Sequence, residues 1–272
     1  MFKPLLAGWG LFSYIRPVFN QLKQFFGGNK QEEPSSSLTD FSLMAVDIHS
    51  HLIPGIDDGV KTMEDSISIL RKFHEMGFKK IITSPHVVSD GYNNTTEIIL
   101  SGRDKVRAAI KENNIPIEFD AVAEYYLDDS INEKIEKKDL LTLGNNFVLV
   151  ELSYLTKTNN IRDLIYKLQV AGYRVILAHP ERYPYFYEKD FKEYTELKDR
   201  SVYFQINLMS LVGKYGKGAK AVAEKLIDEK MVNFVGTDLH NENSLEVIKS
   251  CLKEKYLEKI LTYDKLLNKT LV

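Results

Sequence analysis

Residues 47–59 read Asp-Ile-His-Ser-His-Leu-Ile-Pro-Gly-Ile-Asp-Asp-Gly and follow an apolar run at residues 43–46. If this run is a β-strand, residues two apart share a face, so Asp47, His49 and His51 point the same way. Two imidazoles on one face of a strand can chelate one cation. The stretch therefore indicates a metal site at a strand end, although a histidine pair on a strand can also be ordinary surface.

The second half of this stretch is a turn that adds carboxylates. Pro54 and Gly55 reverse the chain, and Asp57 and Asp58 follow before Gly59. We expect Asp58 to be the loop ligand because it directly precedes the glycine, with Asp57 as a helper or a bystander. Imidazole nitrogens and carboxylate oxygens would then converge on one point.

Length and composition limit the classes to which the protein can belong. The chain has 272 residues, 44% of them hydrophobic, and a net charge of −2. This length suits one large domain or two small ones, and an α/β barrel would use it as a single unit. The composition lacks the basic excess of a nucleic-acid binder, so no nucleic-acid partner is expected. A single cysteine, Cys251, excludes a disulfide framework and a cysteine-rich zinc site, which fits a cytoplasmic location.

The first 40 residues differ from the rest. Residues 2–26 carry three basic residues, no acidic residue and apolar residues at helical spacing, while glycines and a proline interrupt any membrane-spanning helix. Three interpretations stay open: a helix on the inner membrane surface, a helix packed on the domain, or a disordered tail. Residues 27–40 resemble a linker. We therefore expect a basic amphipathic segment and linker over residues 1–40 and one domain over residues 41–272.

From residue 41 onward, short apolar runs alternate with helical patterns. Parallel strands need crossover connections, and seven strand–helix units in this length favour a closed or nearly closed α/β barrel over an open sheet. The predicted helices cover residues 62–76, 96–112, 128–138, 160–171, 191–198 and 219–230, with a C-terminal helical region over 245–267. The predicted strands cover residues 43–48, 80–83, 118–123, 147–152, 173–178, 202–206 and 232–236.

Six of the seven predicted strands end in a histidine or a carboxylate. Ligands bind at the carboxyl ends of the strands in parallel α/β folds, so these side chains should meet at one mouth. Five of the six histidines take part, and His74, in a helical pattern, is expected at the surface. Nine residues form the predicted metal site: His49, His51, Asp58, His86, Glu124, Glu151, His179, Asp238 and His240.

Imidazole and carboxylate ligands without thiolate suit manganese, iron or zinc. Nine candidates exceed the needs of one ion, and three divalent ions would leave a positive pocket that attracts a phosphate dianion. Metal-bound water is a nucleophile near neutral pH, which is typical of phosphate ester hydrolysis. Arg182 could clamp phosphate oxygens, or else pair with Glu181 or Glu188. A cysteine phosphatase is excluded, because Leu257 stands where Cys251 would need an arginine.

Several motifs lie at the strand ends between Asp47 and His240. They are Asp-x-His-x-His, Ile-Pro-Gly-Ile-Asp-Asp-Gly, Ser-Pro-His, Ala-Glu-Tyr-Tyr, Val-Glu-Leu, Ala-His-Pro-Glu-Arg-Tyr and Thr-Asp-Leu-His. Together they resemble the PHP (polymerase and histidinol phosphatase) superfamily, and most of all its capsule- and exopolysaccharide-linked, manganese-dependent protein-tyrosine phosphatases. The resemblance implies a distorted seven-stranded, TIM-like β/α barrel and a centre of three divalent ions, with manganese favoured. It also implies hydrolysis of phosphotyrosine on a bacterial tyrosine kinase by a metal-bridging hydroxide, without a covalent intermediate.

The resemblance also implies how the nine residues divide among three ions. One ion would be held by His49, His51, Glu151 and Asp238. A second would be held by Glu124, His179 and the shared Glu151, and a third by Asp58, His86 and His240. Asp47 would lie behind them and orient a ligand histidine. Arg182, Asp238 and Glu151 are the predicted catalytic residues.

One departure from the family pattern is the absence of an arginine after His240, where residues 241–245 read Asn-Glu-Asn-Ser-Leu. Phosphate binding would then depend on Arg182 and the metals. Lys214 and Lys217 are either substrate contacts or solvated lysines in a loop. Three functions stay open: a protein-tyrosine phosphatase, a small-molecule phosphomonoesterase of the histidinol phosphate type, and a weakly active regulator that docks a kinase.

Overall fold

The computed structural model describes residues 36–157, 159–187 and 190–271. Residues 36–272 form one compact unit. The predicted amphipathic segment at residues 2–26 and most of the predicted linker lie outside the described residues, so the boundary after residue 40 stays a prediction. Among the described helices, none is long and apolar enough to cross a membrane.

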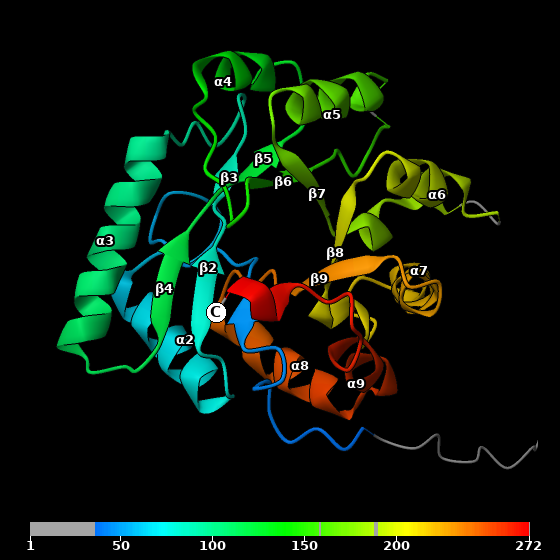
Figure 1. The fold of residues 1–272 in the computed structure, drawn as a ribbon. Helices are drawn as coiled ribbons and strands as arrows, with labels where there is room; N and C mark the ends of the chain where they lie inside the picture. The colour runs from blue at the N-terminus through cyan, green and yellow to red at the C-terminus, as the bar shows by residue number, and fades with distance from the viewer. Residues whose placement is uncertain (1–35, 158, 188–189, 272) are drawn as a thin grey trace, which may run out of the picture. The chain divides into compact units, whose positions relative to one another are not determined.

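The described strands are all parallel and form two sheets (Figure 1). The first sheet has the order β1-β2-β4, with β1 (Val46–Asp47), β2 (Lys80–Thr83) and β4 (Glu118–Ala121). The second sheet has the order β3-β5-β6-β7-β8-β9, with β3 (His86–Val87), β5 (Glu124–Tyr126), β6 (Phe147–Glu151), β7 (Arg174–Ala178), β8 (Tyr203–Asn207) and β9 (Val232–Gly236). The predicted parallel α/β architecture is confirmed.

The predicted count of seven strands in a closed or nearly closed, distorted barrel is not confirmed. Two short strands were not predicted. The strand predicted over residues 80–83 is present as β2, and β3 begins after Ser84 and Pro85. The strand predicted over residues 118–123 ends two residues early as β4, and β5 begins after Val122 and Ala123. Pro85 has no N–H to donate to a ladder, which explains the first break. Nine short strands in two sheets therefore replace seven strands in one closed ladder, within the described part of the chain.

The outer strands of the two sheets meet at a seam between β1 and β9. Ser50 and Leu239 form an isolated parallel bridge just beyond these strands. Below it, the buried Asn268 side chain donates to the carbonyl oxygens of Val46 (2.9 Å) and Val235 (2.8 Å) and accepts from the Val235 N–H at 2.9 Å. The Asn268 side chain thus joins β1 and β9, which do not pair with each other in either sheet.

The helices lie around the outside of the two sheets (Figure 1). Thr62 caps the first described helix by accepting a hydrogen bond from the Asp65 N–H at 3.1 Å. The described α-helices are α2 (Met63–Glu75), α3 (Thr96–Glu112), α4 (Ile131–Lys137), α5 (Ile161–Val170), α6 (Lys192–Asp199), α7 (Lys217–Asp228), α8 (Leu245–Ser250) and α9 (Lys255–Leu261). Each of them falls within two residues of, or inside, a predicted helical segment.

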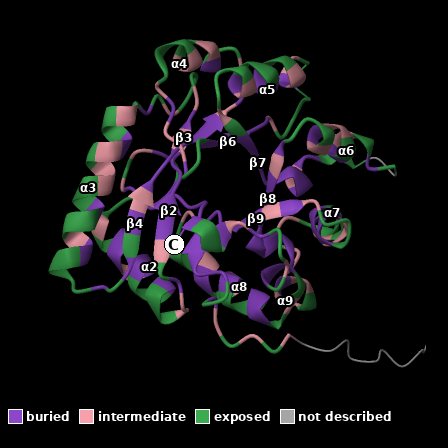
Figure 2. Ribbon diagram, in the orientation of Figure 1, coloured by how far each residue is buried: buried purple, intermediate pink, exposed green. Residues whose placement is uncertain are grey.

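Most strand residues are buried, and the helices bury one side and expose the other (Figure 2). Along β6, Phe147 and Leu149 belong to a small inner apolar cluster, whereas Val148 and Val150 pack in the larger cluster beneath the helices. Side chains alternate between faces along a strand, so Glu151 continues the inner face. The inner column of β6 therefore ends in a carboxylate at the mouth.

Candidate metal centre

All nine residues predicted as metal ligands lie together, most of them just after the carboxyl ends of strands and two, His86 and Glu124, at the starts of the short strands β3 and β5. They form four overlapping groups, and in each group the nitrogen or oxygen atoms offered lie within 4.8 Å of one another. We call the nine residues the His/carboxylate cluster. Its groups are His51, Asp58, His86 and His240; His49, His51 and Glu124; His49, His179 and Asp238; and His86, Glu124 and Glu151.

Glu124 occupies the middle of the cluster, buried at the start of β5. Its Oε1 lies 3.0 Å from His179 Nε2, and its Oε2 lies 3.1 Å from His49 Nε2 and 3.2 Å from His86 Nδ1. Asp238 lies across from it, with Oδ1 at 3.4 Å from His51 Nε2. Both carboxylates thus face several imidazoles at once.

The geometry groups the residues differently from the division that the resemblance implies. Glu151 lies beside His86, at 3.1 Å between Oε1 and Nδ1, and shares a group with Glu124 rather than with Asp238. Glu124, rather than Glu151, is the carboxylate common to two groups. The group of Asp58, His86 and His240 is present as implied and also includes His51.

Two buried nitrogen atoms of the cluster suggest what the site holds. His51 Nε2 and His86 Nδ1 have no hydrogen-bond partner although both atoms are inaccessible to water. Burying a polar atom without a partner costs about 1–3 kcal/mol, so such atoms usually mark a missing ion or water. Each nitrogen faces carboxylate oxygens rather than hydrogen-bond donors. Neutral imidazoles and carboxylates side by side are the ligands that a divalent cation prefers. The residues present therefore fit divalent metal ions.

Charge within the cluster sets the pKa of its members. Burial disfavours protonation of His49, but the carboxylates of Glu124 and Asp238 outweigh it and raise its pKa to about 9. His179 differs, because burial dominates and lowers its pKa to about 4. Burial would raise the pKa of the Asp238 carboxyl, but the neighbouring imidazoles outweigh burial and hold this pKa well below its usual range. A cation would therefore have to displace protons from part of the cluster.

Two cluster residues have strained backbones. His179 has φ 35° and Asp238 has φ 51°, in the left-handed region that costs a non-glycine residue about 1–2 kcal/mol. His179 directly follows β7 and Asp238 lies two residues after β9. Both are fixed there: the Arg182 N–H donates to the His179 carbonyl, and the Asp238 N–H donates to the His49 carbonyl at 2.7 Å. This strain turns both side chains toward the mouth.

The residues that orient the histidines are not all those expected. His51 Nδ1 lies 2.8 Å from Asp57 Oδ2, so Asp57 is a helper rather than a bystander. Asp47 does not orient an imidazole: both of its carboxylate oxygens accept hydrogen bonds from Thr237, at 2.8 Å each. This corrects the role expected for Asp47, which holds the end of β9 against β1. The partner of His49 Nδ1 is Gln205 Oε1, at 2.8 Å.

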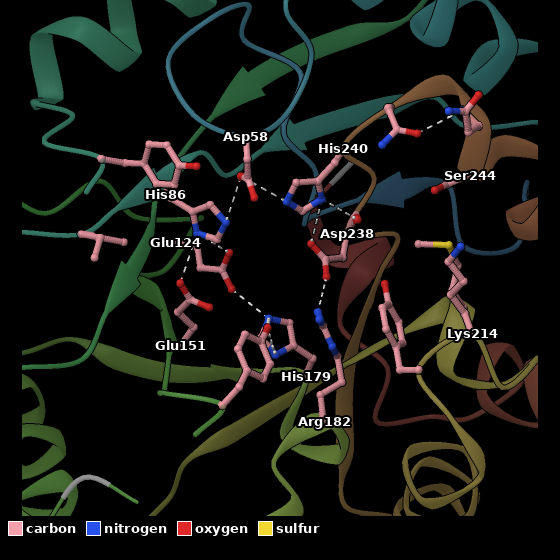
Figure 3. Close-up of a pocket in the computed structure, with 17 residues that line it drawn as sticks. Asp58, His86, Glu124, Glu151, His179, Arg182, Lys214, Asp238, His240 and Ser244 are labelled. Carbon is pink, nitrogen blue, oxygen red and sulfur yellow. Dashed lines mark hydrogen bonds and ion pairs between the residues drawn. The ribbon is translucent and has the colours of Figure 1, made fainter. Parts of the chain in front are cut away.

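Arg182 lies at the edge of the cluster and points toward it (Figure 3). Its Nη1 donates to Asp238 Oδ2 at 2.6 Å, so its ion pair is with a predicted metal ligand rather than with the adjacent Glu181. Its guanidinium lies between two aromatic rings, 4.7 Å from the centroid of Tyr154 and 4.1 Å from that of Tyr215. Ring faces and one carboxylate thus fix the guanidinium while its other N–H groups stay available.

Above the cluster is a cavity of about 580 Å³ (Figure 3). Four of its lining residues, Tyr154, Arg182, Lys214 and Tyr215, form what we call the pocket rim. Lys217, the other lysine considered from the sequence, begins α7 and is not among the lining residues. After His240, where the resemblance led us to expect an arginine, the lining is Asn241, Asn243 and Ser244.

Sequence reasoning missed four residues of the site: Tyr154, Gln205, Asn207 and Tyr215. The tyrosines come from loops after strands, where spacing carries no signal. Gln205 and Asn207 could have been noticed in the sequence. They lie at the end of β8, which matches the one predicted strand that is not followed by a histidine or carboxylate. Polar residues two apart at the end of a buried strand indicate a polar environment on its inner face.

A parallel α/β fold that presents imidazoles and carboxylates at one mouth is typical of metal-dependent hydrolases. The family model for capsular polysaccharide synthesis proteins CpsB/CapC matches residues 45–267. The chain belongs to this family. The resemblance predicted from the strand-end motifs is confirmed.

Relatives in this family have been described as tyrosine phosphatases. Tyrosine-protein phosphatase YwqE of Bacillus subtilis is 29% identical over 197 residues, which cover 72% of this chain and 77% of YwqE. Tyrosine-protein phosphatase CpsB of Streptococcus pneumoniae is 30% identical over 207 residues, which cover 73% of this chain and 84% of CpsB. The class of enzyme predicted from the sequence is the class of these relatives.

Solved structures agree with this assignment. A crystal structure from a study of YwqE from Bacillus subtilis and CpsB from Streptococcus pneumoniae, described as unique metal-dependent tyrosine phosphatases, matches with a TM-score of 0.73 at 27% identity. The match covers 83% of this chain and 90% of that structure. An amidohydrolase from Mycoplasma synoviae, at 12% identity and a TM-score of 0.51, shares the fold alone.

Proposed function

We propose that this chain is a metal-dependent protein-tyrosine phosphatase. The observation that carries the proposal is the His/carboxylate cluster itself, five imidazoles and four carboxylates at the base of one open cavity with Arg182 at its edge. Membership in the CpsB/CapC family, whose relatives are named tyrosine-protein phosphatases, supports it.

The nine residues of the cluster would hold three divalent ions, manganese in preference to iron or zinc. Oxygen and nitrogen donors without thiolate support this choice of metals. The ions would supply an activated water as the nucleophile and neutralise charge on the phosphoryl group. The two sheets, joined at the β1–β9 seam, would act as one distorted barrel that keeps the ligands at fixed separations.

The protein's own part in the reaction is to bind and orient the phosphate ester. Arg182 would hold phosphate oxygens through the N–H groups not used by Asp238. A phenolate leaving group, with a parent pKa near 10, needs less protonation than an alkoxide. No cysteine lines the cavity, and Cys251 is buried with Sγ directed to the Leu208 carbonyl, which supports a reaction without a phosphocysteine intermediate.

The proposed substrate is a phosphotyrosine-bearing protein, a bacterial tyrosine kinase linked to capsule or exopolysaccharide synthesis. The open cavity can admit a side chain that is still part of a polypeptide, and Lys214 at its rim can face acidic groups of such a partner. The cytoplasmic location and the membrane contact through residues 2–26 stay predictions.

Phosphate release tests the function. The full chain should release phosphate from a phosphotyrosine peptide with Mn²⁺ and lose this activity with a chelator. A phosphoserine peptide and histidinol phosphate should be turned over much more slowly under the same conditions. Preference for histidinol phosphate would instead favour a small-molecule phosphatase, and no turnover of any substrate with Mn²⁺, Fe²⁺ or Zn²⁺ would overturn the proposal.

A further inference from the structure

β8 is the one predicted strand that ends without a histidine or carboxylate, and it carries Gln205 and Asn207 instead. Tyr203 packs against the inner apolar cluster, and residues two apart share a face, so Gln205 and Asn207 follow on the inner side. Both side chains are completely buried. Buried amides need partners for all their polar atoms, so the direction of each amide can be worked out from its neighbours.

The Gln205 amide has a defined direction. Its Nε2 donates to the Ile206 carbonyl at 2.8 Å and to Asn207 Oδ1 at 2.9 Å, so its Oε1 is the atom that faces His49 Nδ1. A carbonyl oxygen only accepts, so a neutral His49 must carry its proton on Nδ1. The lone pair of Nε2 then points into the cluster, 3.1 Å from Glu124 Oε2.

The Asn207 amide is directed by the same contact. Because its Oδ1 accepts from Gln205, its Nδ2 donates, and the acceptor is Asp238 Oδ2 at 2.7 Å. The same Oδ2 accepts from Arg182 Nη1 at 2.6 Å. Two donors therefore occupy Oδ2 and leave Oδ1 facing the imidazoles, 3.4 Å from His49 Nε2.

The surroundings hold this amide pair in place. Asn207 N–H donates to the buried Glu181 Oε1 at 2.9 Å, and Ser210 Oγ donates to the same oxygen at 2.6 Å. Gly236 leaves the necessary space: a Cβ there would come within 2.6 Å of His49 Cβ and 2.9 Å of Gln205 Nε2. Any other residue at position 236 would displace the contact between Gln205 and His49.

We propose that Gln205 and Asn207 are positioning residues that select which atoms of His49 and Asp238 meet the metal. Gln205 makes His49 coordinate through Nε2, and Asn207 turns Asp238 so that Oδ1 faces the ion while Oδ2 holds Arg182. This inference rests on the proposed metal-dependent function and deepens it. Partners of this kind behind a ligand typically change metal affinity by about 10- to 100-fold.

Mn²⁺ binding by the full chain, measured by calorimetry, tests the pair. Gln205→Met keeps the volume but removes the acceptor, and it should weaken Mn²⁺ binding by about 10- to 100-fold. Gln169→Met is the matched control and should leave binding unchanged, because the half-buried Gln169 side chain on α5 donates to the Arg200 carbonyl and contacts no residue of the cluster among the described hydrogen bonds.

A second measurement does not depend on the variants folding. In the Zn²⁺-loaded wild type, ¹⁵N histidine spectra should show His49 coordinated through Nε2 with its Nδ1–H retained. Coordination through Nδ1, or a Gln205→Met protein that binds Mn²⁺ as the wild type does, would overturn the positioning role alone. A wild type that binds no divalent ion would overturn both this inference and the proposed function.

Discussion

The His/carboxylate cluster and the pocket rim face one cavity but are built differently. In the cluster, His49 and Glu124 are completely buried and opposite charges surround them. In the rim, Tyr154 is 39% exposed, Lys214 is exposed, and aromatic faces with one ion pair hold Arg182. A buried charge that loses its partner costs several kcal/mol, whereas an exposed contact costs about 1 kcal/mol. Loss of one cluster residue should therefore abolish most of the activity, whereas loss of one rim residue should reduce it only partly.

The largest expected effect is on a cluster member. His179→Ala should lower Mn²⁺-dependent turnover of a phosphotyrosine peptide by about 1000-fold or more, because about 4 kcal/mol of transition-state stabilisation depends on a complete metal set. Steady-state kinetics at saturating Mn²⁺ measure this. His74→Ala is the control, since His74 is exposed on α2. If the His179→Ala protein turned over the peptide at the wild-type rate, the cluster would not be more sensitive to substitution than the rim, contrary to the prediction.

Arg182 belongs to the rim by position and touches the cluster through Asp238. Arg182→Lys removes the planar fork but keeps the charge, so kcat/KM should fall by about 100-fold. Mn²⁺ affinity should change by less than about tenfold, because Asp238 keeps its imidazole neighbours. The control is Arg162→Lys, which changes an arginine paired with Glu196 near the surface. A larger loss of Mn²⁺ affinity than of kcat/KM would place Arg182 with the cluster.

The cluster should also respond to pH in a way that the rim does not. Burial lowers the pKa of His49 and His86, but Glu124 and its neighbouring carboxylates outweigh it and raise the pKa to about 9 and about 10 in the metal-free protein. This stabilises the metal-free fold below the ordinary pKa of 6.5, and the stabilisation is lost as pH rises through 9. Mn²⁺ must displace these protons, so its affinity should fall about tenfold per pH unit on acidification for each proton that a bound ion displaces.

Thermal unfolding at several pH values with and without Mn²⁺ checks this. The Tm of the chelated protein should fall between pH 6.5 and 9, and the increase in Tm produced by Mn²⁺ should grow over the same interval. An increase that does not vary with pH would show that the imidazoles are already free of protons, contrary to the prediction.

The smallest effect is expected for an aromatic rim residue. Tyr154→Leu removes one face of the support of Arg182, worth about 1 kcal/mol, so kcat/KM should fall by about fivefold with Mn²⁺ affinity unchanged. Tyr166→Leu on α5 is the control, since Tyr166 is exposed away from the cavity lining. A fall of 100-fold or more for Tyr154→Leu would mean that the rim is as cooperative as the cluster.

Much of the fold could be predicted from local patterns. The α3 helix has the bounds that its periodicity predicts: Thr95 caps it, Asn113 ends it, and it continues through Gly102 without a break. The arrangement of the strands could not be decided from local patterns alone. Pro85 explains one break, but the gap after β4 and the division into two sheets depend on how neighbouring strands meet. The role of Asp47 was wrong for a similar reason: its partner is Thr237, 190 residues away.

The sequence alone determined which residues reach the mouth, because a parallel strand delivers the residues at its carboxyl end to one edge, whatever lies between the strands. His49, His179 and Asp238 are examples. Only the tertiary structure decided how these residues group and which of their atoms face inward. That choice depends on contacts such as the one between His49 and Gln205, which are 156 residues apart. Because the buried Gln205 NH₂ group already has its acceptors, only the amide oxygen can face His49.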